Sequence, residues 1–274
     1  MKKNFHWTMQ VLSLTLLTGL PVMLSAQDDR FTKGANVQFG VQDAELIERL
    51  MPIVQGVGGT AREMLQQQSV KAYMMPVRKV GERGSDLSYA LATCLEYYIN
   101  IDQNYKINLS PDYISLNIEN TGRRVTLADA FRVLAEDGTV NAAIVPYEAI
   151  MLTDAVYATQ KYKISNYLHI FREVTPGRQR VYEVRKALMR GNPVLVELRA
   201  NQNIKTLNTR QLQPTDGDQL FPLIVVGYDE SQQALEVLSC WGREWAAGGY
   251  AWISYEHFGK YAANGYVLAP AAGR

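Results

Sequence analysis

The chain has 274 residues, of which 47% are hydrophobic and 20% are charged, with 28 Lys and Arg against 27 Asp and Glu. This composition excludes a disordered, collagen-like or coiled-coil protein. Because no block of like charges occurs, recognition of nucleic acid by bulk charge is also excluded. A chain of this length buries roughly 70 to 75% of the surface that its unfolded form exposes, so it needs no metal or disulfide to fold.

Residues 1–26 have the pattern of a secretory signal peptide. Lys2 and Lys3 precede a mostly apolar run from Val11 to Leu24, and Ser25-Ala26 follows with small side chains. The alternative is a transmembrane anchor, but the run contains Pro21 and is only about 14 residues long, whereas a spanning helix needs roughly 20. We therefore predict cleavage after Ala26 and an exported protein, periplasmic or extracellular, with no membrane span once the signal is removed.

Helical spacing of apolar residues dominates the first half of the chain. After a polar leader at 27–42, residues 43–50 and 61–68 are predicted to form two short packing helices. A longer pattern from Asp86 to Asn100 follows Gly84-Ser85 and predicts a central buried helix. Either Ser85 or Asp86 can cap the N-terminus of that helix.

Short strand-like runs dominate the second half, after a further helix predicted at 126–136. The runs lie at 162–171, 193–198, 220–228, 235–239 and 250–255, with one helix predicted at 182–190 between them. Helices followed by strands indicate an α+β fold, in which two lobes meet at a groove where ligands usually bind.

Cysteine and histidine are scarce in the mature chain. Cys94 and Cys240 can pair in an oxidising compartment, or each can be a small buried hydrophobic residue, which is the commoner state of an isolated Cys. His169 lies in a strand pattern and His257 in a predicted turn, and we expect both to be packed or surface residues. No spacing matches a Cys/His metal site, so we expect no metal and no cofactor.

Several linked motifs occur between residues 70 and 269. They are Pro76-Val-Arg-Lys-Val-Gly-Glu-Arg-Gly-Ser-Asp86, Gly191-Asn-Pro-Val194, Phe221-Pro-Leu-Ile-Val-Val-Gly-Tyr228 and Ser239-Cys-Trp241-Gly-Arg-Glu-Trp245. In this order and spacing they resemble the papain family of cysteine peptidases. The resemblance implies an α+β, papain-like two-lobed fold, with a helical lobe at about 70–160 and a β-barrel lobe at about 161–269.

The resemblance also divides the chain into segments. The predicted organisation is a signal peptide at 1–26, an N-terminal extension with short helices at 27–69, a papain-like domain at 70–269 and a C-terminal tail at 270–274.

Catalysis in that family depends on a Cys at the N-terminus of the central helix, a His from the β lobe, an Asn that orients the His, and a Gln that helps form the oxyanion hole. Aligned on Pro76, Gly81 and Gly84-Ser85, the first motif places Asp86 at the Cys position and Val80 at the Gln position. Phe221 stands where the His is expected, and Ser239 where the Asn is expected. All four catalytic positions are therefore changed.

A serine nucleophile does not rescue this alignment. Sliding the first motif by two residues would offer Ser88, but it breaks the glycine matches and still leaves no base at Phe221. The family positions that this sequence retains are those that maintain the fold, among them Trp241 and Trp245. The favoured hypothesis is a secreted pseudopeptidase that binds a peptide or protein partner. Its expected binding residues are Asp86, Phe221, Trp241, Arg123 and Arg124.

Several alternatives stay open. One is a hydrolase or transferase whose remodelled site uses Asp86 or Cys240, although Asp86 as a helix cap is favoured over Asp86 as a catalytic carboxylate. Another is a structural subunit of an exported complex, with residues 43–68 as a docking arm or simply packed on the β lobe. The cleft at Val80 and Phe221 is expected to be apolar, and to be filled by side chains rather than open.

Overall fold

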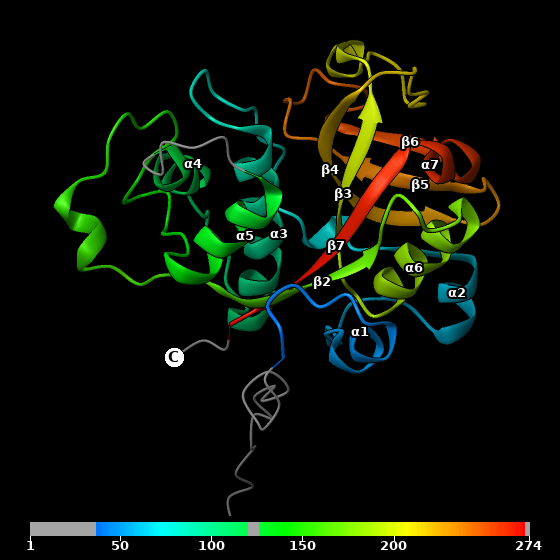
Figure 1. Cartoon of the computed structure of the whole chain (residues 1–274), viewed down its shortest axis with the longest axis horizontal. Helices are drawn as coiled ribbons and strands as arrows, with labels where there is room; N and C mark the ends of the chain where they lie inside the picture. The colour runs from blue at the N-terminus through cyan, green and yellow to red at the C-terminus, as the bar shows by residue number, and fades with distance from the viewer. Residues whose placement is uncertain (1–36, 120–125, 272–274) are drawn as a thin grey trace, which may run out of the picture.

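The computed structural model describes residues 37–119 and 126–271, which form a helical lobe and a β lobe lying side by side (Figure 1). The predicted signal peptide lies outside the described residues, as do Gly122, Arg123 and Arg124. Within the two described ranges, no helix is both long enough and apolar enough to cross a membrane.

The helical lobe is built on α3 (Asp86–Gln103), α4 (Pro111–Glu119) and α5 (Leu127–Glu136). Helix α3 is buried continuously from Ser88 to Asn100, which confirms the predicted central helix. Helix α4 was not predicted. It starts at a proline, and the Oγ of Ser110 accepts a hydrogen bond from the N–H of Tyr113 (3.1 Å). This serine-proline start is a helix signal, but the apolar spacing that follows it is weak.

The β lobe is an antiparallel sheet with the strand order β2-β7-β3-β4-β5-β6, and a short β1 pairs with β4. The strands are β1 (Gln67–Ser69), β2 (Ile164–Phe171), β3 (Val194–Ala200), β4 (Gln219–Asp229), β5 (Ala234–Leu238), β6 (Tyr250–Ser254) and β7 (Ala262–Pro270). Helices α6 (Gly177–Met189) and α7 (Tyr255–Tyr261) pack against this sheet. The predicted α+β class, with a helical lobe followed by a β lobe, is confirmed.

Two elements near the C-terminus differ from the prediction. His257 lies in helix α7 rather than in a turn, because Ser254 caps the segment by accepting the N–H of His257 (3.1 Å). The following residues form β7, which is a central strand between β2 and β3. Apolar residues lie on both sides of this short capped helix. The sequence pattern alone therefore predicted one strand followed by a turn.

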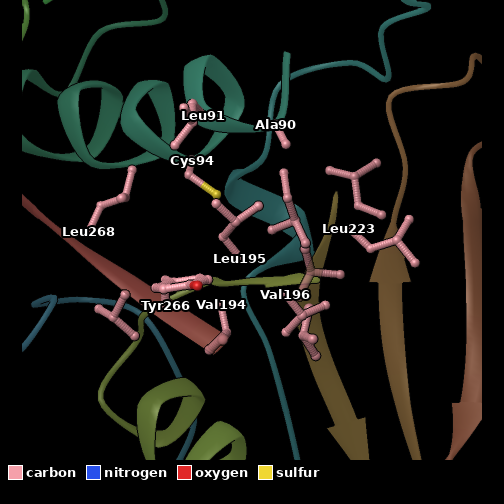
Figure 2. Packing of buried hydrophobic residues seen from close by; sticks show 14 of the residues in the cluster. Ala90, Leu91, Cys94, Val194, Leu195, Val196, Leu223, Tyr266 and Leu268 are labelled. Atoms are coloured by element: carbon pink, nitrogen blue, oxygen red, sulfur yellow. The ribbon is translucent and has the colours of Figure 1, made fainter. Parts of the chain in front are cut away.

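The core joins the two lobes across α3. Figure 2 shows Cys94 of α3 pointing toward Leu195 of β3, with Leu91 and Leu268 nearby. All of these side chains are buried in one continuous hydrophobic cluster. Because α3 is buried against the sheet as well as against its own lobe, the N-terminus of α3 is held in a fixed position relative to β3 and β4.

The N-terminal extension belongs to the β lobe from residue 41 onward. Val41 pairs with β2 through hydrogen bonds to Tyr167 and His169 (3.0 and 2.8 Å). Helix α1 (Ala44–Leu50) buries Leu50, and its Glu48 forms an ion pair with Lys186 of α6 (2.9 Å). The next helix, α2 (Ala61–Gln66), leads directly into β1. Helix α1 is therefore packed on the β lobe, whereas α2 buries none of its residues.

A buried ion pair fixes the segment that leads into α3. Arg78 contacts the Oε2 atom of Glu96, and their side chains are only 8% and 1% exposed. The same oxygen accepts the N–H of Leu109 (2.6 Å). Burial raises the pKa of the Glu96 carboxyl, and the charge of Arg78 opposes that effect. Since the pair is buried, each partner depends on the other for compensation of its charge.

Replacing Arg78 by Met should lower the free energy of unfolding at neutral pH by about 3 to 5 kcal/mol, because Glu96 is left buried and unpaired. The difference in the free energy of unfolding between the wild type and the variant should shrink as the pH falls. A carboxyl whose pKa is higher in the folded state than in the unfolded state binds its proton more tightly when folded, so acid favours folding over that range. Urea unfolding at several pH values measures both effects.

The double variant Arg78→Met, Glu96→Leu is the matched control, since it removes both charges. It should be more stable at neutral pH than Arg78→Met alone. A deficit that is the same in the single and double variants, or that does not change with pH, would show that the cost comes from lost packing rather than from an unpaired charge.

Candidate functional site

The site is built around the start of α3. Ser85 is the N-cap of this helix, and its Oγ accepts the N–H of Ser88 (3.0 Å). Of the two caps that the sequence allowed, Ser85 is therefore the one observed, and the cap role favoured for Asp86 is wrong because Asp86 is the first helical residue. The reason is geometric, because Ser85 has extended backbone angles while its hydroxyl reaches the open amide of the first turn. The carboxylate of Asp86 is therefore available for another partner.

That partner is Lys205 of the β lobe. The Oδ2 atom of Asp86 lies 2.5 Å from the Nζ atom of Lys205, and the two side chains are 19% and 36% exposed. Lys205 belongs to a short 3-10 helix, Gln202–Thr206, in the connection between β3 and β4. The ion pair thus links the two lobes at the position where the nucleophile was expected.

Two aromatic rings also lie close to the ammonium group of Lys205. The Nζ atom of Lys205 is 5.7 Å from the ring centroid of Phe221 and 5.7 Å from that of Trp241. These two rings meet edge to face with centroids 6.0 Å apart, and Trp241 meets Trp245 in the same way at 5.2 Å. Phe221 is only 4% exposed. Side chains therefore fill the place where a catalytic imidazole was expected.

Val80 and Ser239 contribute through their backbones. The N–H of Val80 donates to the carbonyl of Cys240 (2.8 Å), which pairs the segment before α3 with the segment after β5. Ser239 is buried, and its N–H donates to Gly249 (3.0 Å). The Val80 side chain packs against the hydrophobic core. An apolar valine side chain offers no hydrogen-bond donor to an oxyanion.

Both cysteines are free and buried. Burial raises the pKa of the Cys240 thiol to about 12, with the charge of Arg78 opposing this effect and that of Asp86 adding to it. Burial also raises the pKa of Cys94. Since the thiolate is the nucleophilic form, neither side chain has the properties of a reactive cysteine.

The two histidines of the described residues lie in the β lobe away from these groups. The Nε2 atom of His169 is 3.1 Å from the Oδ1 atom of Asn264, and its ring stacks on Tyr266 with centroids 4.5 Å apart. Burial lowers the pKa of His169. His257 lies in α7 beside Tyr261. Within the described ranges, no contact joins either imidazole to Asp86, and no cluster of His, Cys, Asp and Glu could hold a metal ion.

The structure thus brings together Asp86, Phe221 and Trp241, three of the five residues expected to bind a partner, while Arg123 and Arg124 lie outside the described residues.

Lys205 was missed because it lies in a loop without periodic spacing. Glu96 is easier to recognise from the sequence, because it is a charged residue inside a helix that is otherwise buried. An ion pair covered by aromatic rings can neutralise charge and hold the lobes together, but it contains no nucleophile beside a base.

Solved structures of cysteine proteases are similar to this chain. Xylellain, a cysteine protease from Xylella fastidiosa, is 18% identical with a TM-score of 0.62, over 87% of this chain and 97% of that one. The bromelain protease from Ananas comosus, in complex with the E64 inhibitor, is 19% identical with a TM-score of 0.59, over 74% and 98%. The Carica candamarcensis protease CMS1MS2, in complex with E-64, is 17% identical with a TM-score of 0.57, over 76% and 99%.

At these identities the structural likeness establishes the fold alone. No curated protein matches the sequence significantly. The family model described as papain family cysteine protease matches residues 62–271, a range that begins slightly before the domain start predicted at residue 70. The chain therefore belongs to the papain family of cysteine proteases.

Proposed function

We propose that this protein is an exported pseudopeptidase of the papain family, which binds a peptide or protein partner without cleaving it. The observation that carries the proposal is the ion pair between Asp86 and Lys205 beneath Phe221 and Trp241. Peptide cleavage by a cysteine protease requires a thiolate and an adjacent base. In the alignment of the motifs, a carboxylate and a phenyl ring stand where those two groups are expected, which supports the proposal.

The electrostatics of the site support this proposal. The N-terminus of α3 favours a negative charge, because the free amides of its first turn and the helix dipole act together. Asp86 supplies that charge, and Lys205 balances it. No proton transfer is needed for this pair to form, so it links the lobes as long as no ligand displaces Lys205.

The indole of Trp241 supports a binding role. Among the described residues its N–H group has no hydrogen-bond acceptor. A main-chain carbonyl of a bound peptide would supply one if Lys205 moved aside. Phe221 is buried, so it supports such a ligand from beneath and does not contact it directly. Export is supported by the signal-like sequence at 1–26.

The alternative is a hydrolase that uses Asp86 or Cys240. Cys240 is a poor candidate because burial raises its pKa to about 12. Asp86 remains the better candidate, since its carboxylate is partly exposed at the N-terminus of a helix. The two functions make different predictions for turnover and for single substitutions.

The purified protein should not hydrolyse a broad peptide library, and it should form no adduct with E-64. Both thiols should also stay unmodified by a soluble disulfide reagent while the protein is folded, because both are buried and protonated. Mass spectrometry measures the adducts, and the urea-unfolded protein, in which both thiols should react, is the control. Thiol-dependent turnover that E-64 abolishes would overturn the proposal.

The variant Asp86→Asn keeps the shape of the side chain and removes its charge. Its free energy of unfolding should fall by no more than about 1 kcal/mol, because a partly exposed ion pair is screened by solvent. Lys205→Met removes the other partner of the same ion pair, and it should lower the free energy of unfolding by a similar amount. Turnover assays accompany both, and a wild-type activity that disappears in Asp86→Asn but not in Lys205→Met would favour the hydrolase.

Replacing Phe221 by Ala should lower the free energy of unfolding by about 3 to 5 kcal/mol, since the ring is buried and leaves a cavity. Phe221→Leu, which keeps most of the volume, should cost clearly less. Urea unfolding compares the two. A Phe221→Ala variant that keeps its stability but loses peptide binding would instead show that the cleft is open to the ligand.

A further inference from the structure

A buried carboxylate connects two helices of the helical lobe with the turn at residues 146–149. Asp112 lies in the first turn of α4 and is only 3% exposed. Its Oδ2 atom accepts the N–H of Glu148 (2.7 Å) and the hydroxyl of Tyr89 in α3 (3.2 Å). Asp112 therefore links α4, α3 and the turn, and it takes no part in the inter-lobe ion pair.

The turn holds an unfavourable backbone angle. The carbonyl of Pro146 accepts the N–H of Ala149 (3.3 Å), and Glu148, the third residue of this β-turn, has a φ of 62°. A third position with positive φ favours Gly or Asn, because other side chains are strained there. Such strain persists only where neighbouring contacts hold the conformation. The hydrogen bond from Glu148 to Asp112 is a contact of this kind.

The charges around Asp112 do not neutralise it. Among the described residues, no cation contributes to its pKa. The cations of the elements nearby have other partners, which are Glu96 for Arg78, the Tyr113 hydroxyl for Lys161, Asp129 for Arg132 and Asp86 for Lys205. The other charged side chains of residues 76–85, of α3, of α5 and of the loop 146–160 are exposed, namely Lys79, Glu82, Arg83, Asp102, Glu136, Glu148 and Asp154. A buried carboxylate without a counter-ion depends on its hydrogen bonds.

The strength of those hydrogen bonds depends on the charge of Asp112. Burial raises the pKa of this carboxyl, and the charge of Glu119 on the same helix acts in the same direction. The hydrogen bonds from Glu148 and Tyr89 oppose that effect, because they stabilise the ionised form. A hydrogen bond to an ionised acceptor is roughly twice as strong as one between neutral groups. Protonation therefore weakens the contact that holds the strained turn.

The turn covers part of the segment that leads into α3. The ring of Tyr147 is 6.4 Å from the ring of Tyr89, and the guanidinium of Arg78 is 5.6 Å from the Tyr147 centroid. The side chain of Glu148 packs against Gly81, where an added Cβ would lie 2.8 Å from the Cγ atom of Glu148. Release of the turn would therefore uncover Arg78 and loosen the contact at Gly81.

We infer that Asp112 is a pH-dependent latch on the turn at 146–149. When it is ionised, its carboxylate holds Glu148 at positive φ and keeps Tyr147 beside Arg78. When mild acid protonates it, the turn is released and the segment before α3 becomes more mobile. This latch is separate from the inter-lobe ion pair, so the inference does not rest on the proposed function.

The test is hydrogen exchange of the Glu148 amide in the purified protein, measured by NMR as a protection factor. The protection factor corrects for the intrinsic effect of pH on exchange. It should fall about tenfold between pH 7 and about pH 4, as expected when a charge-assisted hydrogen bond becomes a neutral one. The carboxyl carbon signal of Asp112 should titrate over the same range. The amide of Leu195 in β3 reports global unfolding and should keep its protection.

Two variants identify the carboxylate. Asp112→Asn removes the charge and keeps an oxygen acceptor, so at neutral pH its Glu148 amide should have the low protection that the wild type shows in acid. It should also no longer respond to pH. Glu119→Gln is the matched control, since it removes a carboxylate from the opposite end of the same helix. It should leave the protection of Glu148 at neutral pH unchanged.

A third variant, Glu148→Gly, removes the strain. Glycine adopts positive φ without a side-chain penalty, so the turn should persist whether or not Asp112 is ionised. The amide at position 148 should then change its protection by less than about threefold over the same pH range. If Asp112→Asn does not fold, this comparison with the wild type still decides the question.

Three results would overturn the inference. They are a protection factor of Glu148 that does not change with pH in the wild type, an equal loss of protection in Glu119→Gln and Asp112→Asn, and a pH response in Glu148→Gly that equals that of the wild type. A loss at Leu195 that matches the loss at Glu148 would also overturn it, because it would show global unfolding. None of these outcomes depends on whether the inter-lobe site is catalytic.

Discussion

The charge of Glu96 in the middle of α3 has to be compensated inside the protein, and much of the local structure follows from that requirement. Helix α3 is buried continuously from Ser88 to Asn100, so this carboxylate cannot reach bulk water. Arg78 supplies the compensating charge from the segment that precedes the helix. Tying that segment to α3 also places Val80 against Cys240 and sets Asp86 at the exposed start of the helix.

The buried ion pair between Arg78 and Glu96 therefore helps to fix the position of the site. A helix N-terminus that faces a second lobe attracts a negative charge whatever group carries it. In this protein the group is the carboxylate of Asp86, and the opposite lobe provides Lys205. We propose that this arrangement keeps the electrostatic balance of a papain-type site while removing the proton transfer on which cleavage depends.

Strand β4 connects the inter-lobe site with the N-terminal extension. Its beginning places Phe221 close to Lys205, and its end pairs with β1 of the extension. The extension therefore adds a short edge strand to the sheet that carries the site.

Local sequence patterns determined much of this protein. The apolar spacing from Asp86 to Asn100 predicted a buried helix, and linked motifs predicted the two-lobed fold and marked Asp86, Val80, Phe221 and Ser239 as candidate site positions, because burial periodicity and short turn motifs are properties of neighbouring residues. Tertiary structure alone decided what those positions contact. Lys205 meets Asp86, and Val80 pairs with Cys240, only because the lobes and strands pack in one particular way. Contacts between residues so far apart in the chain leave no periodic trace in the sequence, since they depend on the docking of elements and not on the order of adjacent side chains.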